Sequence, residues 1–184
     1  MNVTKMKIAI CGKMCSGKTT LANDIRRMDG RYTIYSFGAK VKDVAHDLFS
    51  MDEGAKDRSL LTGIGTKMRE IDPDVWVKYV LKNVNTEFCL IDDLRYQNEY
   101  EALAKNGWTI LQLHVPRDVQ EERIRKKYPD TCEDHLANLS HESEANRFTW
   151  LPGKEPVLTI DASQDYKKIY QQVYSFIQKH EYNR

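Results

Sequence analysis

Residues 12–19, GKMCSGKT, match the pattern GxxxxGK[ST] and directly follow the apolar run KIAIC. Glycines let such a loop curl so that successive backbone N–H groups point inward, where phosphate oxygens can accept their hydrogen bonds. The helical pattern that starts near Lys18 adds the positive end of a helix. In this pattern the lysine reaches the β- and γ-phosphates of a nucleoside triphosphate, and the Thr19 hydroxyl coordinates Mg²⁺. The expected nucleotide contacts in the loop are Gly12, Lys13, Cys15, Ser16, Gly17, Lys18, Thr19 and Thr20.

Two carboxylates and an arginine end another apolar run, in the stretch FCLIDDLR (88–95). Side chains at the carboxyl end of a parallel strand face the ligand crevice of an α/β sheet. Asp93 could accept a proton from an attacking group or hold Mg²⁺ through water, and Arg95 could clamp a phosphate with two hydrogen bonds. Asp92 is interpreted instead as a helix N-cap or turn residue. The stretch therefore predicts a second anion site.

Cations in the middle of the chain extend the candidates for that second site. Lys40 and Lys42 lie two residues apart, so on a helix they point in different directions, and one is expected to bind phosphate while the other is solvated. Arg58 is compatible with a ligand contact and with simple solvation. Arg69 is compatible with a ligand contact and with a structural ion pair.

Short β-type runs alternate with longer helical patterns, which is the order of a three-layer α/β domain with a five-stranded parallel sheet. Several runs are apolar almost throughout, as expected for strands covered on both faces. The predicted strands are 7–11, 32–37, 88–92, 109–115 and 157–160. Residues 1–184 are expected to form one domain, with an acceptor-binding region at about 37–80. The polar, irregular stretch 126–150 is typical of a mobile lid, which is placed at about 117–150.

Helix signals mark the segments between these strands. Asp72 is the expected N-cap, and Pro73 the first residue, of one helix. Gly107 is typical of a helix C-terminus. Gly63 and Gly65 are expected to weaken their segment as a helix and to permit close backbone approach. The predicted helices are 18–28, 39–49, 72–84, 98–107 and 163–180, the last with an apolar face of Ile169, Val173, Phe176 and Ile177.

Composition restricts the classes of function. The net charge is +1, so a long polyanion such as DNA is not indicated and an anionic ligand must be recognised locally. No apolar run approaches the ~20 residues that span a bilayer, and the N-terminus lacks a signal-peptide layout. The cysteines lack zinc spacing and are expected to be reduced thiols of a cytoplasmic protein, with Cys15 as loop filler rather than an oxidation-sensitive site. They are Cys11, Cys15, Cys89 and Cys132.

Three blocks together resemble deoxynucleoside monophosphate kinases of the bacteriophage and viral type. The blocks are GKMCSGKTT, LLTGIGTKMREIDPDVWVKYVL and IDDLRYQNEYEAL. These belong to the P-loop nucleoside monophosphate kinase group. The family's GT-x-x-R-x-x-D-P-x-x-W block is matched by Gly65, Thr66, Arg69, Asp72, Pro73 and Trp76. Its D-V-R-F-x-N-E block is matched, with two mild changes, by Asp93, Leu94, Arg95, Tyr96, Asn98 and Glu99. The resemblance runs from residue 6 to about 115 and more weakly to the C-terminus.

The resemblance implies a P-loop kinase fold and transfer of the γ-phosphoryl group of ATP, with Mg²⁺, to a deoxynucleoside 5′-monophosphate. Lys18 and the loop would hold the donor phosphates, and Thr19 the metal. Asp93 would lie near the metal or the acceptor sugar. The implied substrate contacts are Phe37, Lys40, Arg69, Trp76, Asp93, Arg95 and Asn98. Among these, Arg69 and Arg95 would bind the acceptor phosphate. Trp76 is equally compatible with burial in the core, and Asn98, like Glu99, with a cap of the next helix.

Further cations are expected from the lid, because two anions must be brought together away from water. Arg123 is expected at the transferred phosphates, so that the candidate catalytic residues are Lys18, Asp93, Arg95 and Arg123. Arg117 follows the fourth strand and is expected near the donor adenine, which the turn 161–163 with Ala162 would also contact. A solvated basic helix, with Arg125 and the other arginines balanced by Glu121 and Glu122, is equally plausible. In LSHESE, Ser140, His141 and Ser143 are interpreted as structural, part of a capping motif.

Two other functions stay open. One is a kinase of another small phosphorylated acceptor, such as dephospho-coenzyme A or phosphomevalonate, and the other is a regulatory module that binds ATP without transferring it. The absence of an NKxD motif argues against a GTPase switch. The expected partners are small-molecule nucleotides, with no nucleic acid polymer and no membrane, and a homodimer is left open. The expected location is the cytoplasm, that of the host for a phage-encoded chain.

Overall fold

The computed structural model describes all residues except 1–4, 55–56, 141–147 and 183–184. The chain divides into two compact units. The first unit contains Met1–Ile34 and Thr86–Arg184, and the second contains Tyr35–Asn85. The second unit includes the stretch 37–80 to which the sequence assigns the acceptor. His141 and Ser143 of the predicted capping motif lie outside the described residues.

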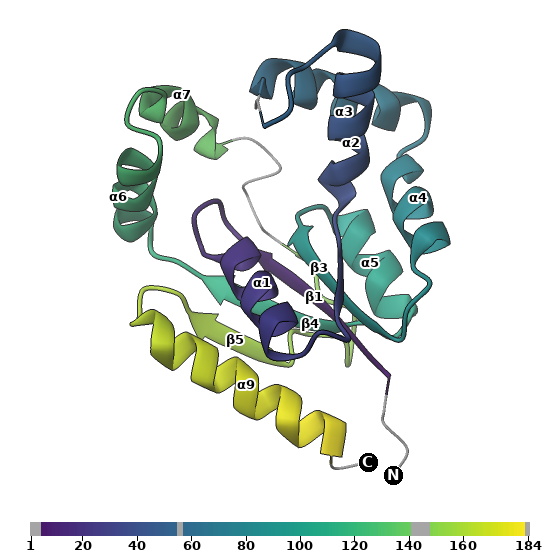
Figure 1. The fold of residues 1–184 in the computed structure, drawn as a ribbon, viewed down its shortest axis with the longest axis vertical. Coiled ribbons are helices and arrows are strands. Elements are labelled where there is room, and N and C mark those ends of the chain that lie inside the picture. Colours follow the sequence, from purple (N-terminus) through teal and green to yellow (C-terminus); the bar gives the residue numbers. More distant parts are fainter. Residues whose placement is uncertain (1–4, 55–56, 141–147, 183–184) are drawn as a thin grey trace. The chain divides into compact units, whose positions relative to one another are not determined.

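All five predicted strands are present and form one parallel sheet (Figure 1). They are β1 Met6–Gly12, β2 Thr33–Tyr35, β3 Phe88–Leu94, β4 Thr109–His114 and β5 Leu158–Asp161. Their order across the sheet is β2-β3-β1-β4-β5. The second strand is shorter than predicted, because Phe37 already begins a helix.

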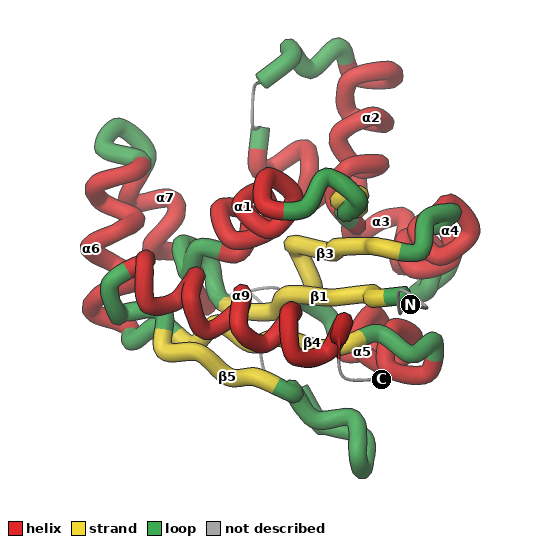
Figure 2. The backbone as a smooth tube through the Cα atoms, turned by 60° about the horizontal axis from the view of Figure 1, so that its bottom comes forward, coloured by secondary structure: helices red, strands yellow, loops and turns green. Residues whose placement is uncertain are grey.

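Helices cover both faces of the sheet in the first unit. The connections from β1 to β2 and from β3 to β4 run in opposite directions across the sheet, so right-handed crossovers place α1 and α5 on opposite faces. Helix α9 lies along the α1 face (Figure 2), because Ile169 of α9 and Leu21 of α1 belong to one buried cluster. The helices are α1 Lys18–Met28, α5 Gln97–Lys105 and α9 Tyr166–Tyr182. The three-layer α/β fold is therefore confirmed.

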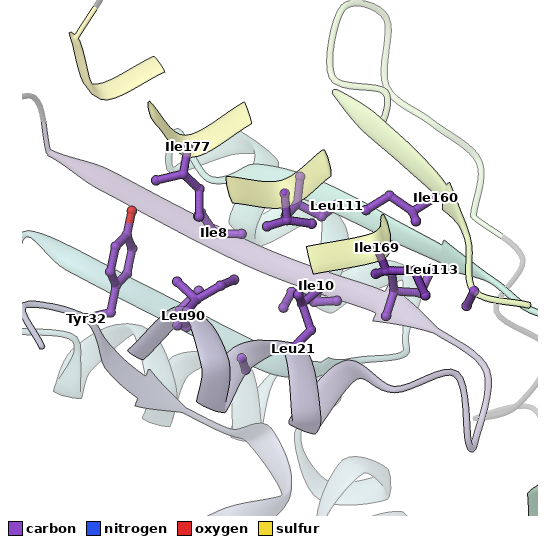
Figure 3. Packing of buried hydrophobic residues seen from close by; sticks show 14 of the residues in the cluster. Ile8, Ile10, Leu21, Tyr32, Leu90, Leu111, Leu113, Ile160, Ile169 and Ile177 are labelled. Carbon is purple, nitrogen blue, oxygen red and sulfur yellow. The ribbon is translucent and has the colours of Figure 1, made fainter. Parts of the chain in front are cut away.

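The main core of the first unit lies between the sheet and helices α1 and α9 (Figure 3). Ile8 and Ile10 of β1 are fully buried there, together with residues of both helices. The predicted apolar face of α9 is confirmed, since three of its residues are buried and Phe176 packs against them. Each such side chain stabilises the fold by about 1.5–3 kcal/mol. This packing holds β1 firmly, and with it the loop that leaves its carboxyl end.

The region after residue 126, predicted to be irregular, is partly helical. Here α6 spans Arg117–Lys127, α7 spans Cys132–Ala137 and the 3-10 turn η1 spans Asn138–Ser140. Ile124 and Leu139 bury against Met14 of the glycine loop, which gives this polar sequence an apolar anchor. Farther on, the Gln97 side chain exchanges two hydrogen bonds with the Thr149 backbone, at 2.9 and 3.0 Å. Movement of this region as a lid remains a prediction.

The described residues of the second unit include three helices, α2 Phe37–Phe49, α3 Arg58–Ile71 and α4 Val75–Asn83. Helix α3 is continuous over 14 residues, so Gly63 and Gly65, which were expected to weaken this segment, do not interrupt it. The Asp57 carboxylate accepts the Leu60 N–H at 2.9 Å and caps the helix, and Ile64 is buried, which together offset a cost of about 1 kcal/mol for each glycine. In the described part of the chain, no helix combines the length and apolar character needed to cross a membrane.

Asp72 is not the N-cap of the following helix, contrary to the sequence-based expectation. It follows the last residue of α3, and its carboxylate accepts the Asp74 N–H at 3.0 Å and pairs with Lys78 at 2.7 Å. Helix α4 begins only at Val75, so Pro73 lies in the turn before it. Asp74, rather than Asp72, therefore stands directly before the first residue of α4. An Asp side chain can close a turn onto the N–H two residues later, as Asp72 does here.

Candidate functional site

The glycine loop connects β1 to α1, as the sequence predicts. Gly12 ends β1 beside Leu113 of β4, and a Cβ atom at this position would lie 2.6 Å from the Leu113 carbonyl oxygen. No side chain fits there, so the first glycine of the pattern is required by the sheet itself. Helix α1 then begins at Lys18, and its first turn contains no acidic residue, which leaves its positive end available to an anion.

Two polar side chains of the loop, those of Lys18 and Ser16, are buried. Lys18 is only 7% exposed, and its Nζ donates to the carbonyl oxygens of Gly12 at 2.5 Å and Lys13 at 2.8 Å. Ser16 is buried, and among the described residues no hydrogen-bond partner is found for its Oγ. Buried polar atoms in native proteins rarely lack a partner, so a ligand that accepts from Ser16 fits this loop.

The Asp92 carboxylate lies close to Lys18 and Thr19 at the end of the glycine loop. It lies within β3, so its interpretation as a helix N-cap or turn residue is wrong. The Thr19 hydroxyl and Lys18 both lie near enough to the Asp92 carboxylate to lower its pKa. Burial, and secondly the neighbouring Asp93, nevertheless raise the pKa of Asp92 above its ordinary value.

Strand alternation is the signal that could have identified Asp92. Leu90 of β3 packs in the core on the α1 face, and Asp92 is two residues farther along the same strand. It therefore points toward the start of α1, where Thr19 lies. The register of β1 and β3 shifts between the pairs Ala9–Ile91 and Cys11–Leu94, so a bulge lies at this pair of carboxylates.

Asp93 and Arg95 are half-buried at the end of the same strand. Their roles at an acceptor remain predictions. The expected capping role of Glu99 is confirmed, because its carboxylate accepts the backbone N–H of Arg95 at 2.9 Å and of Tyr96 at 3.0 Å. Asn98 lies half-buried in the first turn of α5.

Helix α6 holds the glycine loop from outside. The Gln120 amide donates to the Met14 carbonyl oxygen at 3.0 Å, and Arg123 donates to the carbonyl oxygens of Cys15 at 3.3 Å and Ala162 at 2.7 Å. Gln120 was not predicted. Its spacing of three residues from Arg123 puts both on one helical face, but only the fold brings that face to the loop.

The other two arginines of α6 have acidic partners. Arg117, expected near the adenine, forms an ion pair with Glu121, and Arg125 pairs with Glu133 at 3.1 Å. Arg123, and not Arg117, reaches Ala162. For Arg117 and Arg125 the structure agrees with the interpretation of a solvated basic helix.

The turn after β5 is ordered by its own side chains. The Asp161 carboxylate accepts the Ser163 N–H at 2.8 Å and the Ser163 hydroxyl at 2.6 Å, and these bonds lower the pKa of Asp161. The Ala162 N–H donates to the His114 carbonyl oxygen at 2.6 Å. This turn therefore lies next to the carboxyl end of β4.

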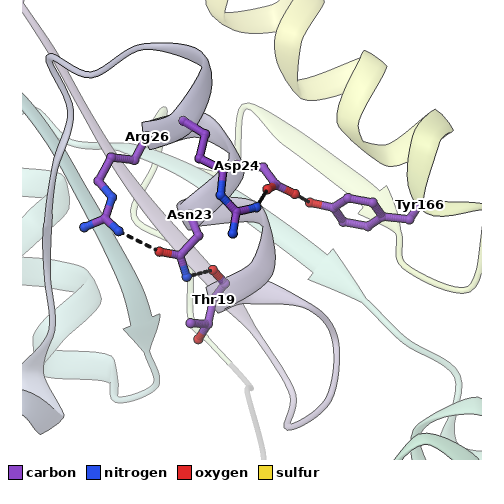
Figure 4. Close-up of polar contacts among 6 residues, drawn as sticks. Thr19, Asn23, Asp24, Arg26 and Tyr166 are labelled. Carbon is purple, nitrogen blue, oxygen red and sulfur yellow. Dashed lines mark hydrogen bonds and ion pairs between the residues drawn. The ribbon is translucent and has the colours of Figure 1, made fainter.

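Contacts on the outer side of α1 fix the helix that carries Thr19 (Figure 4). The Asn23 amide donates to the Thr19 carbonyl oxygen at 2.8 Å. Tyr166 of α9 donates to the Asp24 carboxylate, which also pairs with Arg27. Burial, and then this hydrogen bond, raise the pKa of Tyr166. The contacts tie α1 to α9 and keep the first turn of α1 in place.

In the second unit, Gly65 is the point where predicted acceptor residues meet. Arg69 Nη1 donates to its carbonyl oxygen at 3.2 Å, and Trp76 Nε1 does so at 3.3 Å. A Cβ atom on Gly65 would lie 3.3 Å from Arg69 Nη1, a side-chain atom of the same helix, and one on Gly63 would have no neighbour within 4 Å, so the expected close approach of backbone at these glycines stays a prediction. Trp76 is 3% exposed, which agrees with the buried alternative rather than with a flanking role at a base.

The remaining predicted residues of the second unit occupy α2 and α3. Phe37 is buried at the start of α2, and Lys40 lies 3.5 Å from Asp43 and 5.7 Å from the Tyr79 ring centroid. Lys42 is exposed. Arg58 is the first residue of α3. Their contacts with an acceptor remain predictions.

Solved structures share this fold across nearly the whole chain. A gluconokinase from Sinorhizobium meliloti 1021 matches with a TM-score of 0.61 at 14% identity, covering 99% of this chain and 97% of its own. Shikimate kinase from Acinetobacter baumannii, in complex with shikimate, matches with a TM-score of 0.59 at 18% identity, covering 97% and 96%. At these identities the likeness shows the fold.

No curated protein matches the chain. A family model described as AAA domain matches residues 8–145. The matched stretch includes the glycine loop, Asp92 and the two α6 side chains that hold the loop. The chain therefore belongs to the AAA domain family.

Proposed function

We propose that the protein transfers the γ-phosphoryl group of ATP, with Mg²⁺, to a deoxynucleoside 5′-monophosphate, producing the diphosphate and ADP. The observation that carries this proposal is Asp92, a buried carboxylate set against the Thr19 hydroxyl close to Lys18. Its raised pKa means that the charged form opposes folding of the ligand-free protein, and a bound cation would reverse that penalty.

The residues fit a magnesium nucleotide better than a metal held by protein alone. Among the described residues there is no group of three His, Cys, Asp or Glu side chains that could hold a metal ion. Mg²⁺ usually keeps several waters and is bound by one or two protein groups together with substrate phosphates. Thr19 would coordinate it directly and Asp92 through water. When bound, the ion neutralises charge on the β- and γ-phosphates.

The other residues of the site would bind and orient the donor. The loop N–H groups would donate to the phosphate oxygens, with the Ser16 hydroxyl as a further donor. Lys18, which now donates to two loop carbonyls, would turn its amine to the terminal phosphates. Arg123 and Ala162 would line the side of the nucleotide that faces β5.

The acceptor is proposed from the sequence blocks that carry Asp93, Arg95 and Arg69. A 5′-monophosphate is ionised at neutral pH and needs no strong base, so positioning and charge neutralisation suffice. Arg95 would clamp the acceptor phosphate with two hydrogen bonds. Asp93 would then contact the acceptor sugar rather than accept a proton.

A second candidate is a kinase of a small hydroxyl acceptor, because the solved structures that share the fold include a gluconokinase and a shikimate kinase. A hydroxyl needs a base, and Asp93, half-buried at the end of β3, would supply it. A regulatory module that binds ATP without transfer is the third possibility.

The deciding experiment is coupled ADP release with Mg²⁺–ATP and an acceptor panel. The panel contains the four deoxynucleoside monophosphates, their ribonucleotide counterparts, shikimate, gluconate and dephospho-coenzyme A. We expect turnover that depends on a deoxynucleoside monophosphate. Lys18→Ala should abolish this turnover. Turnover only with a hydroxyl acceptor selects the second candidate, and tight ATP binding without any acceptor-stimulated turnover selects the third.

A further inference from the structure

The middle of the glycine loop has a backbone conformation that needs support. Cys15 has φ of 59°, in the left-handed region, although it is not a glycine. Such a conformation costs a residue with a side chain on the order of 1 kcal/mol and persists only where the surroundings enforce it. The loop sequence alone therefore does not hold its own shape.

Helix α6 supplies that support at two consecutive peptide units. The Met14 carbonyl, which accepts from Gln120, belongs to the peptide before the Cys15 Cα. The Cys15 carbonyl, which accepts from Arg123, belongs to the peptide after it. Fixing the planes of both peptides fixes φ and ψ of the residue between them.

The direction of these bonds matches anion binding. In a trans peptide the N–H points away from the C=O, and the described chain contains no cis peptide. Holding the Met14 carbonyl toward α6 therefore turns the Cys15 N–H away from α6. Successive N–H groups around a left-handed residue form the concave arrangement that binds anions.

The burial of Gln120 suits it to support the loop conformation at Cys15. It is 1% exposed, and Ile124, four residues later, buries against Met14. The amide is therefore held in one position by packing. Arg123 has a second bond to Ala162 and lies at the proposed nucleotide, so substitution there would mix two effects. The Gln120 amide contacts the loop at the Met14 carbonyl oxygen, which points toward α6 and not toward the proposed nucleotide.

We propose that Gln120 is a positioning residue that keeps the glycine loop in its phosphate-binding shape by enforcing the left-handed conformation of Cys15. This inference rests on the nucleotide site of the proposed function, but not on the identity of the acceptor. Gln120 acts through the Met14–Cys15 peptide and touches no reacting atom.

The first test is Gln120→Met, which keeps the volume of the side chain and removes the donor. Mg²⁺–ATP affinity is measured by calorimetry without acceptor, with Gln172→Met on the exposed face of α9 as control. We expect affinity to fall about tenfold, as for the loss of one buried hydrogen bond, with no change in the control. With an active acceptor, KM for ATP rises while kcat and the acceptor KM stay within about twofold.

The second test asks whether the effect passes through Cys15. In the Gln120→Met background, Cys15→Gly removes the conformational penalty, whereas Cys15→Ala keeps it while also losing the thiol. Recovery of ATP affinity with glycine but not with alanine is expected. Equal effects of the two substitutions, or wild-type affinity in Gln120→Met, would overturn the inference.

The two proposals fail in different ways. If no acceptor is phosphorylated but wild-type protein binds ATP, the proposed transfer function is wrong. The calorimetric test still decides whether Gln120 is a positioning residue. If Gln120→Met loses affinity and also melts at a much lower temperature without nucleotide, and glycine at position 15 does not restore affinity, the residue is a core residue only and the inference is wrong.

Discussion

Asp92→Asn is expected to lower activity and to stabilise the ligand-free protein at the same time. The Asp92 side chain is 9% exposed and lies near the Thr19 hydroxyl. Asparagine has nearly the same shape, and its side-chain oxygen can still accept a hydrogen bond from that hydroxyl. The substitution therefore removes a charge and little else.

The stability effect follows from the direction of the pKa shift. A carboxyl whose pKa is raised on folding stabilises the folded state fully at pH below its ordinary value of 3.8, and this contribution is lost as the pH rises through the raised pKa. At neutral pH the charged Asp92 therefore opposes folding, mainly because it is buried and secondly because Asp93 is near. Asp92→Asn should raise Tm at pH 7, and the gain should shrink as the pH falls toward the ordinary value.

The activity effect has the opposite sign. Groups that orient a metal or its waters typically change affinity or activity 10- to 100-fold when they are replaced. For Asp92→Asn this corresponds to about 1.4–2.8 kcal/mol of lost transition-state stabilisation, with a higher Mg²⁺ concentration needed for half-maximal rate.

The assay combines Mg²⁺ titrations of the initial rate with thermal unfolding of nucleotide-free protein at several pH values. Asp47→Asn, an exposed position on α2, is the matched control and should change neither quantity. Unchanged Mg²⁺ dependence in Asp92→Asn would remove this carboxylate from the metal site. A lower Tm at pH 7 would show that the carboxylate is a structural partner instead.

Three other outcomes are expected. Asp93→Asn should reduce kcat less than about tenfold with a phosphate acceptor but 10²- to 10⁴-fold if a hydroxyl is the true acceptor, and kcat measured on both acceptor classes separates the two. Tyr166→Phe, which removes the bond to Asp24, should cost about 1 kcal/mol and lower Tm by about 2–4 °C in a thermal melt, without changing ATP affinity. Burial raises the pKa of Cys11 to about 12, so its thiol should stay unmodified by iodoacetamide at pH 8.5 in native protein and react only after unfolding, as peptide mass mapping would show. Modification of Cys11 at the rate of an exposed thiol would contradict that burial.

Local patterns were sufficient for most elements of the fold. The five strands, α1 and the apolar face of α9 were predicted because their periodicity is carried by neighbouring residues. Helix boundaries were less certain where two signals compete. Asp72 and Asp74 are both suitable residues at a helix start. In the structure the helix starts after Asp74, and Asp72 forms an ion pair with Lys78.

Side-chain roles within the site depended on contacts that are distant in sequence. Asp92 and Asp93 are chemically identical neighbours that strand alternation places on opposite faces, but no local pattern says which face α1 covers. The position of α1 over one face of the sheet and the bulge at Ala9–Cys11 decide which carboxylate meets Thr19. Arg117 was expected on the adenine side because it follows the fourth strand, but Arg123 is the arginine that reaches Ala162.

The sequence by itself determined the chain order of the strands, of helices α1, α2, α4, α5 and α9, and of the loop that curls between β1 and α1, because glycine placement and hydrophobic periodicity are properties of the chain alone. The tertiary structure decided which charges and amides surround that loop. Gln120 lies 106 residues from Met14, and their contact exists only because the sheet places the start of α6 beside the end of β1. Crossover handedness and packing, rather than residue type, select such partners.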